Sequence, residues 1–399
     1  MGSIEACDAE QAILTTAEGQ ALLAEVEATR RPTPADVARW RRSSPPEAVA
    51  AALRLAEGRR KGASKFARAS AMWFDPIGVE QSTPEAVARH KARRFAGGGL
   101  VVDLCSGIGG DSIALAEASG SALAVDLDEG MGRRSLWNAR VHGLEGRVEA
   151  AQSRAEAFAI PRGARVHVDP DRRASGGRKA LAIRDYAPGL AALLALADSA
   201  PGGAIKLGPS SDFDAHFGAG RFEVELVSLG GECKEATAWF GDLADPRARR
   251  RATHLPSGAT WTDLDGPTAP ASIAPPGLAA FVFDPDPTLD RAGLLDGFAA
   301  AHGLRRLAAG VDLLTGPLAV ASPFLSAFEV LETFPLDLKV LRREVAARGL
   351  GPLEIKTRGL PTTPEAYRAR LKPEGSTPAT WLLVAGRGEP GRAILASRV

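Results

Sequence analysis

Cysteine is scarce in this chain, which has only Cys7, Cys105 and Cys233 among its 399 residues. Their spacing fits neither a zinc site nor the framework of a disulfide-stapled domain. The six histidines are equally scattered and have no ligand partners at regular spacing. We therefore expect no metal site, and we expect the protein to work in a reducing compartment, the cytoplasm.

Long apolar runs are also missing. The longest interior run, residues 190–197, is far shorter than the roughly 20 residues that cross a bilayer. The N-terminal segment carries Glu5, Asp8 and Glu10 where a secretory signal would need basic residues and then an apolar stretch. These absences predict a protein that is not exported and has no membrane partner.

Neither sign of charge dominates, because 49 Lys and Arg stand against 48 Asp and Glu, for a net charge of +1. With 45% hydrophobic residues, the chain is neither disordered nor a polyelectrolyte. Any binding of nucleic acid must therefore come from a local basic patch. The length predicts two or three domains, each with an ample core. The sequence predicts no oligomeric state.

A glycine-rich turn is the most informative stretch that is present. Residues 100–116 read as a buried strand, a turn with Gly107, Gly109 and Gly110, and the start of a helix. Glycine lets the backbone bend sharply and approach a ligand, and a helix start presents free backbone N–H groups. Asp126 ends the next apolar run, where a carboxylate can accept hydrogen bonds from a ribose diol. This pattern predicts a site for an adenine nucleoside.

Two departures from the dinucleotide fingerprint narrow the choice of nucleoside. Ser112 stands where the third glycine is expected. Asp111 lies in the first turn of the helix, where its charge would repel a diphosphate but would suit a cationic amino-acid tail or cap the helix. Both departures favour S-adenosylmethionine over NAD.

The segments Asp103-Leu-Cys-Ser-Gly-Ile-Gly-Gly110 and Ala124-Val-Asp-Leu-Asp128 resemble the first two motifs of the class I S-adenosylmethionine-dependent methyltransferases. The resemblance implies a doubly wound, Rossmann-like α/β fold with a seven-stranded sheet that ends in an antiparallel hairpin. It also implies a cofactor site made by Asp103, Cys105, Gly107, Gly109, Gly110, Asp126 and Leu127. The family often places an adenine-binding acid after the third strand, where this chain has Arg154, with Glu156 two places on. The adenine ring would then be recognised by backbone groups or by Glu156.

A second polar cluster follows the predicted fourth strand, residues 164–169. Asp169 and Pro170 stand where the resembling amine methylases carry Asn or Asp followed by Pro. The Asp169 carboxylate and the Pro170 carbonyl can accept hydrogen bonds from an amine and orient its lone pair, so we expect both to be catalytic. Arg172 and Arg173 suit a phosphate or carboxylate of the substrate. The alternative is an ordinary turn at the end of a strand with two solvated arginines.

The segment before the first strand, Met72-Trp-Phe-Asp-Pro-Ile-Gly-Val-Glu-Gln-Ser-Thr-Pro-Glu85, leads into a helix bearing His90. It is similar to the corresponding segment of the cap-type trimethylguanosine synthases over some fifteen residues. This similarity hints at methylation of a guanine in RNA.

The predicted domains are an N-terminal helical domain at 1–64, a methyltransferase domain at 65–262, a linker at 263–277 and an α+β region at 278–399. Within the last region, about 323–399 looks like the THUMP-like domain attached to certain bacterial methyltransferases of poorly defined substrate. The likeness is carried by residues 353–359, 364–372 and 379–384, together with Asp-Pro-x-Arg-Arg at 169–173 and the hairpin residues 231–235. True THUMP domains bind RNA, so the resemblance implies an RNA partner.

Charge gives this expectation modest support. Residues 336–372 hold nine Lys or Arg against four Asp or Glu, enough for a basic face. The arginine-rich run at 247–251 reads as a solvated loop, with a phosphate contact as the alternative.

The sequence therefore predicts an S-adenosylmethionine-dependent methyltransferase that acts on a base amine or ring nitrogen of ribosomal or transfer RNA. One alternative is a methyltransferase of a protein or of a small anionic metabolite. Another is a non-catalytic RNA-binding protein with a vestigial cofactor fold.

Overall fold

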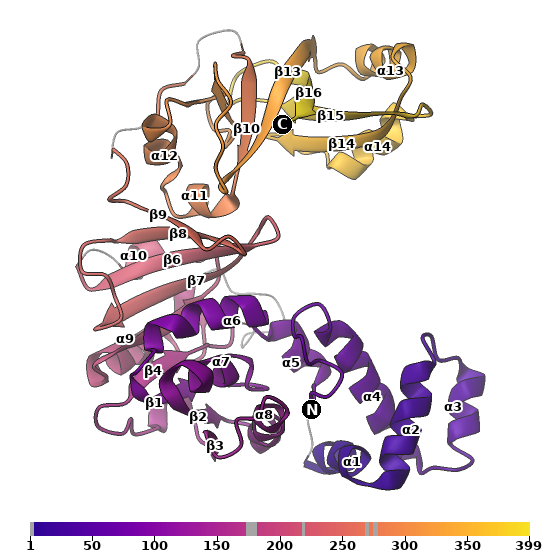
Figure 1. The fold of residues 1–399 in the computed structure, drawn as a ribbon, viewed down its shortest axis with the longest axis vertical. Helices are drawn as coiled ribbons and strands as arrows, with labels where there is room; N and C mark the ends of the chain where they lie inside the picture. Colours follow the sequence, from indigo (N-terminus) through magenta and orange to yellow (C-terminus); the bar gives the residue numbers. More distant parts are fainter. Residues whose placement is uncertain (1–3, 173–181, 218–219, 268–270, 274–277) are drawn as a thin grey trace. The chain divides into compact units, whose positions relative to one another are not determined.

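A computed structural model describes residues 4–172, 182–217, 220–267, 271–273 and 278–399 of the chain (Figure 1). The chain forms two compact units. The first unit comprises Met1–Phe222 and Thr237–Asp245, and the second comprises Glu223–Ala236 and Pro246–Val399. Of the helices in the described ranges, none combines the length and the apolarity needed to cross a membrane.

The first unit begins with the predicted helical region, in the order α1 (Ile4–Thr15), α2 (Ala17–Ala28), α3 (Pro34–Trp40) and α4 (Pro46–Gly62). Thr33 starts α3 with a capping box, because its hydroxyl accepts the N–H of Asp36 while the Asp36 carboxylate accepts the N–H of Thr33. Apolar side chains of these helices, among them Val26, Trp40 and Leu55, form one buried cluster. That cluster is the core of the helical region.

The rest of the first unit is a doubly wound sheet with its helices. Its elements are α5 (Pro76–Gln81), α6 (Glu85–Ala92), η1 (Arg93–Phe95), β1 (Gly99–Leu104), α7 (Gly110–Ser119), β2 (Gly120–Asp126), α8 (Glu129–Val141), β3 (Val148–Gln152), η2 (Ala155–Ala157), β4 (Arg165–Val168), η3 (Ile183–Asp185), α9 (Leu190–Ser199), β5 (Gly202–Leu207) and α10 (Phe213–His216). Strands β3, β2, β1, β4 and β5 lie in that order and run parallel. Their carboxyl ends therefore meet at one edge of the sheet.

The sheet continues through β7 (Glu232–Gly241), β6 (Phe222–Leu229), β8 (Arg250–Leu255) and β9 (Ala259–Thr262). Consecutive strands β6 and β7 are neighbours around the turn at Gly230 and Gly231, as predicted for the closing hairpin. The seven predicted strands are present, and within the described residues two more extend the sheet to nine. The added strands are β8, which pairs parallel to β6, and β9, which pairs antiparallel to β8.

The arginine-rich run explains why β8 was missed. Two of its residues, Arg250 and Arg251, begin the strand instead of lying in a solvated loop. The Arg251 guanidinium pairs with the Glu223 carboxylate of β6 at 2.6 Å. A charged sequence can thus form an inner strand when its neighbour supplies matching charges.

The second unit contains a seven-stranded sheet in the order β11-β12-β10-β13-β16-β15-β14. Its elements are β10 (Phe281–Pro285), α11 (Pro287–Arg291), α12 (Leu295–Ala301), β11 (Arg305–Arg306), β12 (Leu314–Gly316), β13 (Leu325–Pro335), α13 (Leu338–Ala347), β14 (Leu350–Arg358), α14 (Pro364–Leu371), β15 (Thr377–Val384) and β16 (Arg392–Arg398). Helices α11 and α12 are separated at Gly293, which takes a left-handed φ of +69°. Of the predicted linker, residues 268–270 and 274–277 lie outside the described part of the chain.

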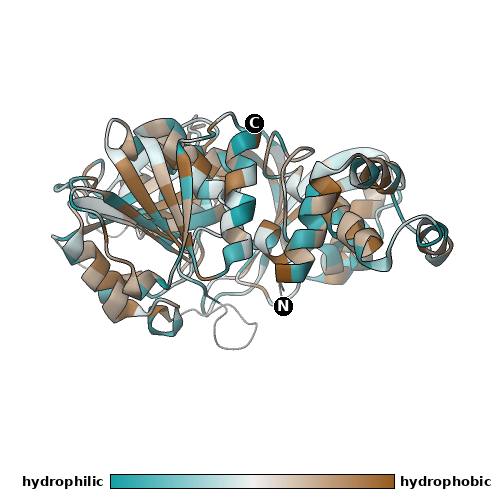
Figure 2. Ribbon diagram, turned by 90° about the horizontal axis from the view of Figure 1, so that it is seen from below, coloured by the Kyte–Doolittle hydropathy of each residue, from teal (hydrophilic) through white to brown (hydrophobic). Residues whose placement is uncertain are grey.

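Figure 2 shows hydrophobic residues along the strands and a mixture of polar and apolar residues along the helices. Strand β5 is the extreme case, since all six of its residues are buried. Lys206 is the single charged residue among them. A lysine amine that is 5% exposed needs a counterion, and its partners lead to the site described next.

Candidate cofactor and substrate site

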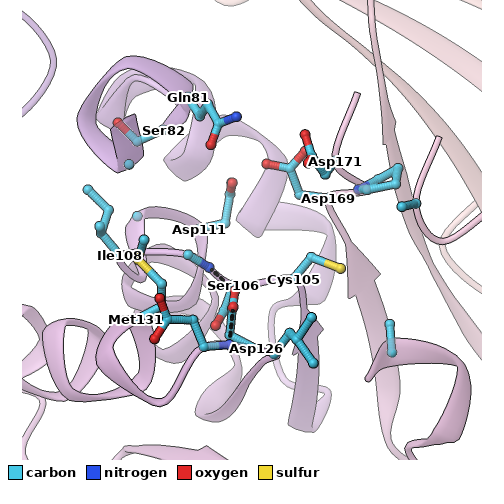
Figure 3. Close-up of a pocket in the computed structure, with 18 of the residues that line it drawn as sticks. Gln81, Ser82, Cys105, Ser106, Ile108, Asp111, Asp126, Met131, Asp169 and Asp171 are labelled. Atoms are coloured by element: carbon cyan, nitrogen blue, oxygen red, sulfur yellow. Dashed lines mark hydrogen bonds between the residues drawn. The ribbon is translucent and has the colours of Figure 1, made fainter. Parts of the chain in front are cut away.

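A cavity of about 800 Å³ opens in the first unit at the carboxyl ends of β1, β2, β3 and β4 (Figure 3). Its volume lies within the usual range for small-molecule sites. Its lining includes Cys105, Gly107, Ile108, Gly110, Asp111, Asp126, Leu127, Met131, Arg154, Glu156, Asp169, Pro170 and Arg172. The structure thus brings most of the predicted site residues to one cavity.

The glycine turn forms one wall of the cavity. Gly107 has a left-handed φ of +53°, and the place where a Cβ would stand is open space. A ligand can therefore approach the backbone at Gly107 closely. Gly109 has a different reason to be glycine: a Cβ there would lie 2.3 Å from the Ser135 hydroxyl oxygen, on α8. Gly109 does not line the cavity and instead allows α7 and α8 to pack.

Asp126 lies at the end of β2 with its carboxylate fixed by the backbone. The N–H of Gly107 donates to Oδ2 at 2.9 Å, and the N–H of Asp128 donates to Oδ1 at 3.0 Å (Figure 3). Burial raises the pKa of this carboxyl, although the two backbone donors oppose the shift. Each oxygen keeps a further lone pair, which suits the two hydroxyls of a ribose. Beside it, Leu127 is 61% exposed and offers an apolar surface to the cavity.

Asp103, predicted as a cofactor residue, lies behind the cavity wall and not on it. Its side chain is buried, accepts a hydrogen bond from the Ser112 hydroxyl, and lies 2.7 Å from Nδ1 of His167. These contacts join β1, the first turn of α7 and β4. Asp103 therefore positions the glycine turn.

Cys105 lines the cavity between β1 and the turn, with a left-handed φ of +59°. Burial, helped by nearby carboxylates such as Asp126, raises the pKa of its thiol. A thiol held protonated in this way is a poor nucleophile, so Cys105 serves as part of the wall.

Asp111 has a different role from the one expected. Its carboxylate lies 3.0 Å from the Lys91 amine and accepts a hydrogen bond of 2.6 Å from the Thr83 hydroxyl. Burial alone would raise the pKa of Asp111, but Lys91 and the neighbouring cations outweigh it, so the pKa lies well below the usual range. Because Lys91 pairs with this carboxylate, Asp111 repels a diphosphate less strongly than the sequence alone predicts. The departure at Ser112 still distinguishes the turn from the dinucleotide fingerprint.

Asp169 and Asp171 lie across the cavity from Asp126, near Gln81 (Figure 3). The Lys206 amine donates to Oδ2 of Asp169 at 2.6 Å and to the Thr83 hydroxyl at 2.7 Å. The backbone N–H of Asp169 donates to the carbonyl of Leu104, which fixes it beside the glycine turn. Pro170 and Arg172 also line the cavity, whereas Arg173 lies outside the described residues.

Further residues that the sequence analysis did not assign to the site also line or support the cavity, among them Gln81, Thr83 and Lys206. Gln81 is the last residue of α5, Thr83 lies between α5 and α6, and Lys206 comes from β5. A lone lysine inside an apolar strand is a signal that could have identified Lys206. Gln81 and Thr83 belong to the segment 72–85 that resembles the trimethylguanosine synthases, but a polar residue in or beside a connecting loop does not by itself identify a site.

The strand end predicted for adenine recognition also lies at the cavity. Both Arg154 and Glu156 line it, and their side chains approach each other to 3.8 Å. Within the described residues, no group of three or more His, Cys, Asp or Glu side chains is arranged to hold a metal ion.

Two family models match parts of the chain. Residues 325–398 match the model "THUMP domain-like", and residues 9–62 match a domain of unknown function, DUF8688. A crystal structure of a candidate methyltransferase from Porphyromonas gingivalis W83 has the same fold, with a TM-score of 0.73 and 21% sequence identity. The match covers 95% of this chain and 98% of that one.

Two curated relatives from Mycobacterium tuberculosis, strains CDC 1551 and H37Rv, are described as uncharacterised S-adenosylmethionine-dependent methyltransferases. Each is 36% identical to this chain over 312 residues, which cover 76% of this chain and 82% of the relative. The cofactor of this chain is therefore S-adenosyl-L-methionine. The chain belongs to the S-adenosylmethionine-dependent methyltransferases.

Proposed function

We propose that this methyltransferase modifies an exocyclic amine or ring nitrogen of a base in ribosomal or transfer RNA. The observation that carries the proposal is that Asp169, with Pro170, faces the same cavity as Asp126. A nitrogen held at Asp169 would then lie in the cavity that also takes the methyl donor. Methyl transfer depends mostly on such positioning.

The cofactor fits the wall around Gly107. The open space at Gly107 admits the ligand, the Asp126 carboxylate can accept the ribose hydroxyls, and Leu127 can cover an apolar part of the adenosine. Ile108 and Met131 add apolar surface on the same side (Figure 3). When bound, the cofactor supplies an electrophilic methyl group on a positively charged sulfur.

The substrate nitrogen is assigned to Asp169 and the Pro170 carbonyl. Lys206 occupies Oδ2 of Asp169 and so fixes the carboxylate, which leaves Oδ1 to accept an N–H of the substrate. Acceptors fixed in this way orient the nitrogen lone pair and stabilise the positive charge that develops as the methyl group arrives. Arg172 remains the candidate for an anionic group of the substrate.

An RNA substrate is supported by the match of residues 325–398 to the THUMP-like family model and by the basic surplus at 336–372. The charge of the cavity opposes the alternative of a small anionic metabolite. Among the described lining residues, eight carry carboxylates and two are arginines: Glu80, Asp111, Asp126, Asp128, Glu129, Glu156, Asp169 and Asp171 against Arg154 and Arg172. Lys91 and Lys206 pair with Asp111 and Asp169, so six carboxylates still face two arginines. A neutral base can enter such a cavity while its phosphates stay outside.

The test is methyl transfer to RNA taken from cells that lack the gene. We expect label from S-adenosylmethionine to enter this RNA, and not RNA from cells that have the gene, whose sites are already methylated. Nucleoside mass spectrometry then identifies the base. The Asp169→Ala variant should transfer label about 100-fold more slowly. Label appearing only in protein or metabolite fractions would overturn the RNA assignment and leave the methyltransferase activity standing.

A further inference from the structure

The N-terminal helices have no part in the proposed reaction, and the family model that matches them has no stated function. Helix α1 nevertheless lies beside α8, the helix that connects β2 and β3 of the methyltransferase sheet (Figure 1). Both belong to the first unit. Two sets of contacts connect α1 to the cofactor cavity.

The first set centres on Glu10, a carboxylate that is 1% exposed. Its Oε2 accepts hydrogen bonds from the Trp73 indole at 2.8 Å and from the Arg134 guanidinium of α8 at 2.7 Å. Its Oε1 accepts a bond of 2.8 Å from Arg54 of α4. Three separate elements thus meet at one buried charge. Removing one partner of such a group is costly, so the contact holds α8 firmly against α1.

The second set reaches the first turn of α8. The Arg133 guanidinium pairs with Asp8 at 2.7 Å and with the side chain of Gln11. The Cys7 sulfur lies 3.5 Å from where a Cβ on Gly130 would stand, an ordinary contact distance, so α1 reaches the start of α8.

That first turn forms the ribose side of the cavity. Asp128 caps α8 by accepting the N–H of Gly130, and its own N–H donates to Asp126. Asp128 and Glu129 both line the cavity. A continuous series of contacts therefore runs from α1 through α8 to the Asp126 carboxylate.

Helix α1 also contributes directly to the lining through Ile4. This side chain is 57% exposed, although it is large and apolar. Leu127, which borders Asp126, is exposed to a similar degree. A ligand with an apolar face, such as adenosine, would remove both side chains from water.

We infer that the N-terminal helical region is a structural part of the cofactor site: α1 fixes the start of α8 and covers the bound adenosine with Ile4. The inference rests on the proposed placement of the cofactor at Asp126. Glu10, Asp8 and Arg133 are positioning residues, whereas Ile4 touches the ligand.

The decisive variant is Ile4→Ala, because an exposed side chain can be shortened without loss of stability. We expect the dissociation constant for S-adenosylmethionine, measured by calorimetry on the full chain, to rise about fivefold. The melting temperature and the turnover at saturating cofactor should not change. Leu136→Ala, an equally simple change at a 42% exposed position of α8 outside the lining, should leave the dissociation constant unchanged.

A second variant tests the contact between Asp8 of α1 and Arg133 of α8. Asp8→Ala removes an exposed partner of Arg133, and we expect it to raise the same dissociation constant about twofold. Adding Asp8→Ala to Arg133→Ala should cause little further loss if Asp8 acts through Arg133. Wild-type affinity in both Ile4→Ala and Asp8→Ala would overturn the inference. If the Asp126→Ala variant instead binds cofactor as tightly as the wild-type protein, the placement of the cofactor at Asp126, on which this inference rests, is overturned.

Discussion

The two sides of the cavity hold their principal carboxylates by different means. Asp126, on the cofactor side, is fixed by backbone N–H groups of Gly107 and Asp128. Asp169, on the proposed substrate side, is fixed by the side chain of Lys206, which in turn binds Thr83. A backbone donor depends on the local conformation alone, whereas a side-chain donor depends on a residue from a distant part of the chain. A short sequence motif therefore determines the cofactor side, whereas the substrate side depends on residues that are distant in the sequence.

The largest effect should come from Asp126→Ala. Removing the carboxylate takes away the acceptors for the ribose and leaves two backbone N–H groups unpaired, so we expect cofactor affinity to fall at least 100-fold. Calorimetry with S-adenosylmethionine measures the loss, and Glu145→Ala, at an exposed position, is the control. Unchanged affinity would show that Asp126 does not hold the cofactor.

Asp169→Ala should affect the other side alone. We expect kcat to fall about 100-fold, because the substrate nitrogen loses its acceptor, while cofactor affinity changes less than about twofold. Single-turnover kinetics on RNA separates the two quantities. Asp198→Ala, at an exposed carboxylate, should behave as wild type. An equal loss of cofactor affinity would show that the two sides are not independent.

Lys206→Met tests the side-chain support. Its loss leaves the buried Asp111 and the Asp169 carboxylate with one cation fewer, so we expect kcat to fall about tenfold and the free energy of unfolding to fall by about 3 kcal/mol. Lys206→Arg should recover part of kcat. Denaturant unfolding and turnover measure both effects, with the exposed Lys234→Met as the control. Full activity in Lys206→Met would show that Asp169 does not need Lys206 for its role in the reaction.

The smallest expected effect is that of pH on the cofactor side. The pKa of Asp126 is raised by burial, so the carboxyl takes up a proton at a higher pH than an ordinary aspartate does. Ribose hydroxyls prefer the ionised acceptor, and cofactor affinity should therefore fall severalfold as the pH drops through that raised pKa. Calorimetry between about pH 4 and 8 measures the fall. An unchanged acidic decline in Asp126→Asn would assign it to another group.

The same contrast explains what the sequence could predict. The glycine turn, Asp126 and the closing hairpin are local patterns, and the structure contains each of them. Lys206, Thr83 and the compensation of Asp111 depend on residues that only folding brings together. Strand β8 was missed because its arginines read as solvated until Glu223 supplies a partner. Placing charges correctly thus requires the tertiary structure.

The buried carboxylate of Glu10 limits how the chain can be shortened. A fragment that starts at residue 65, where the sequence suggests a domain boundary, would lose Glu10 and Arg54 while keeping Trp73 and Arg134. Its surface would then carry a newly exposed indole and a guanidinium without its counterion. Protein made for crystallography or assays should therefore retain the N-terminal helices, since their contacts continue beyond residue 65.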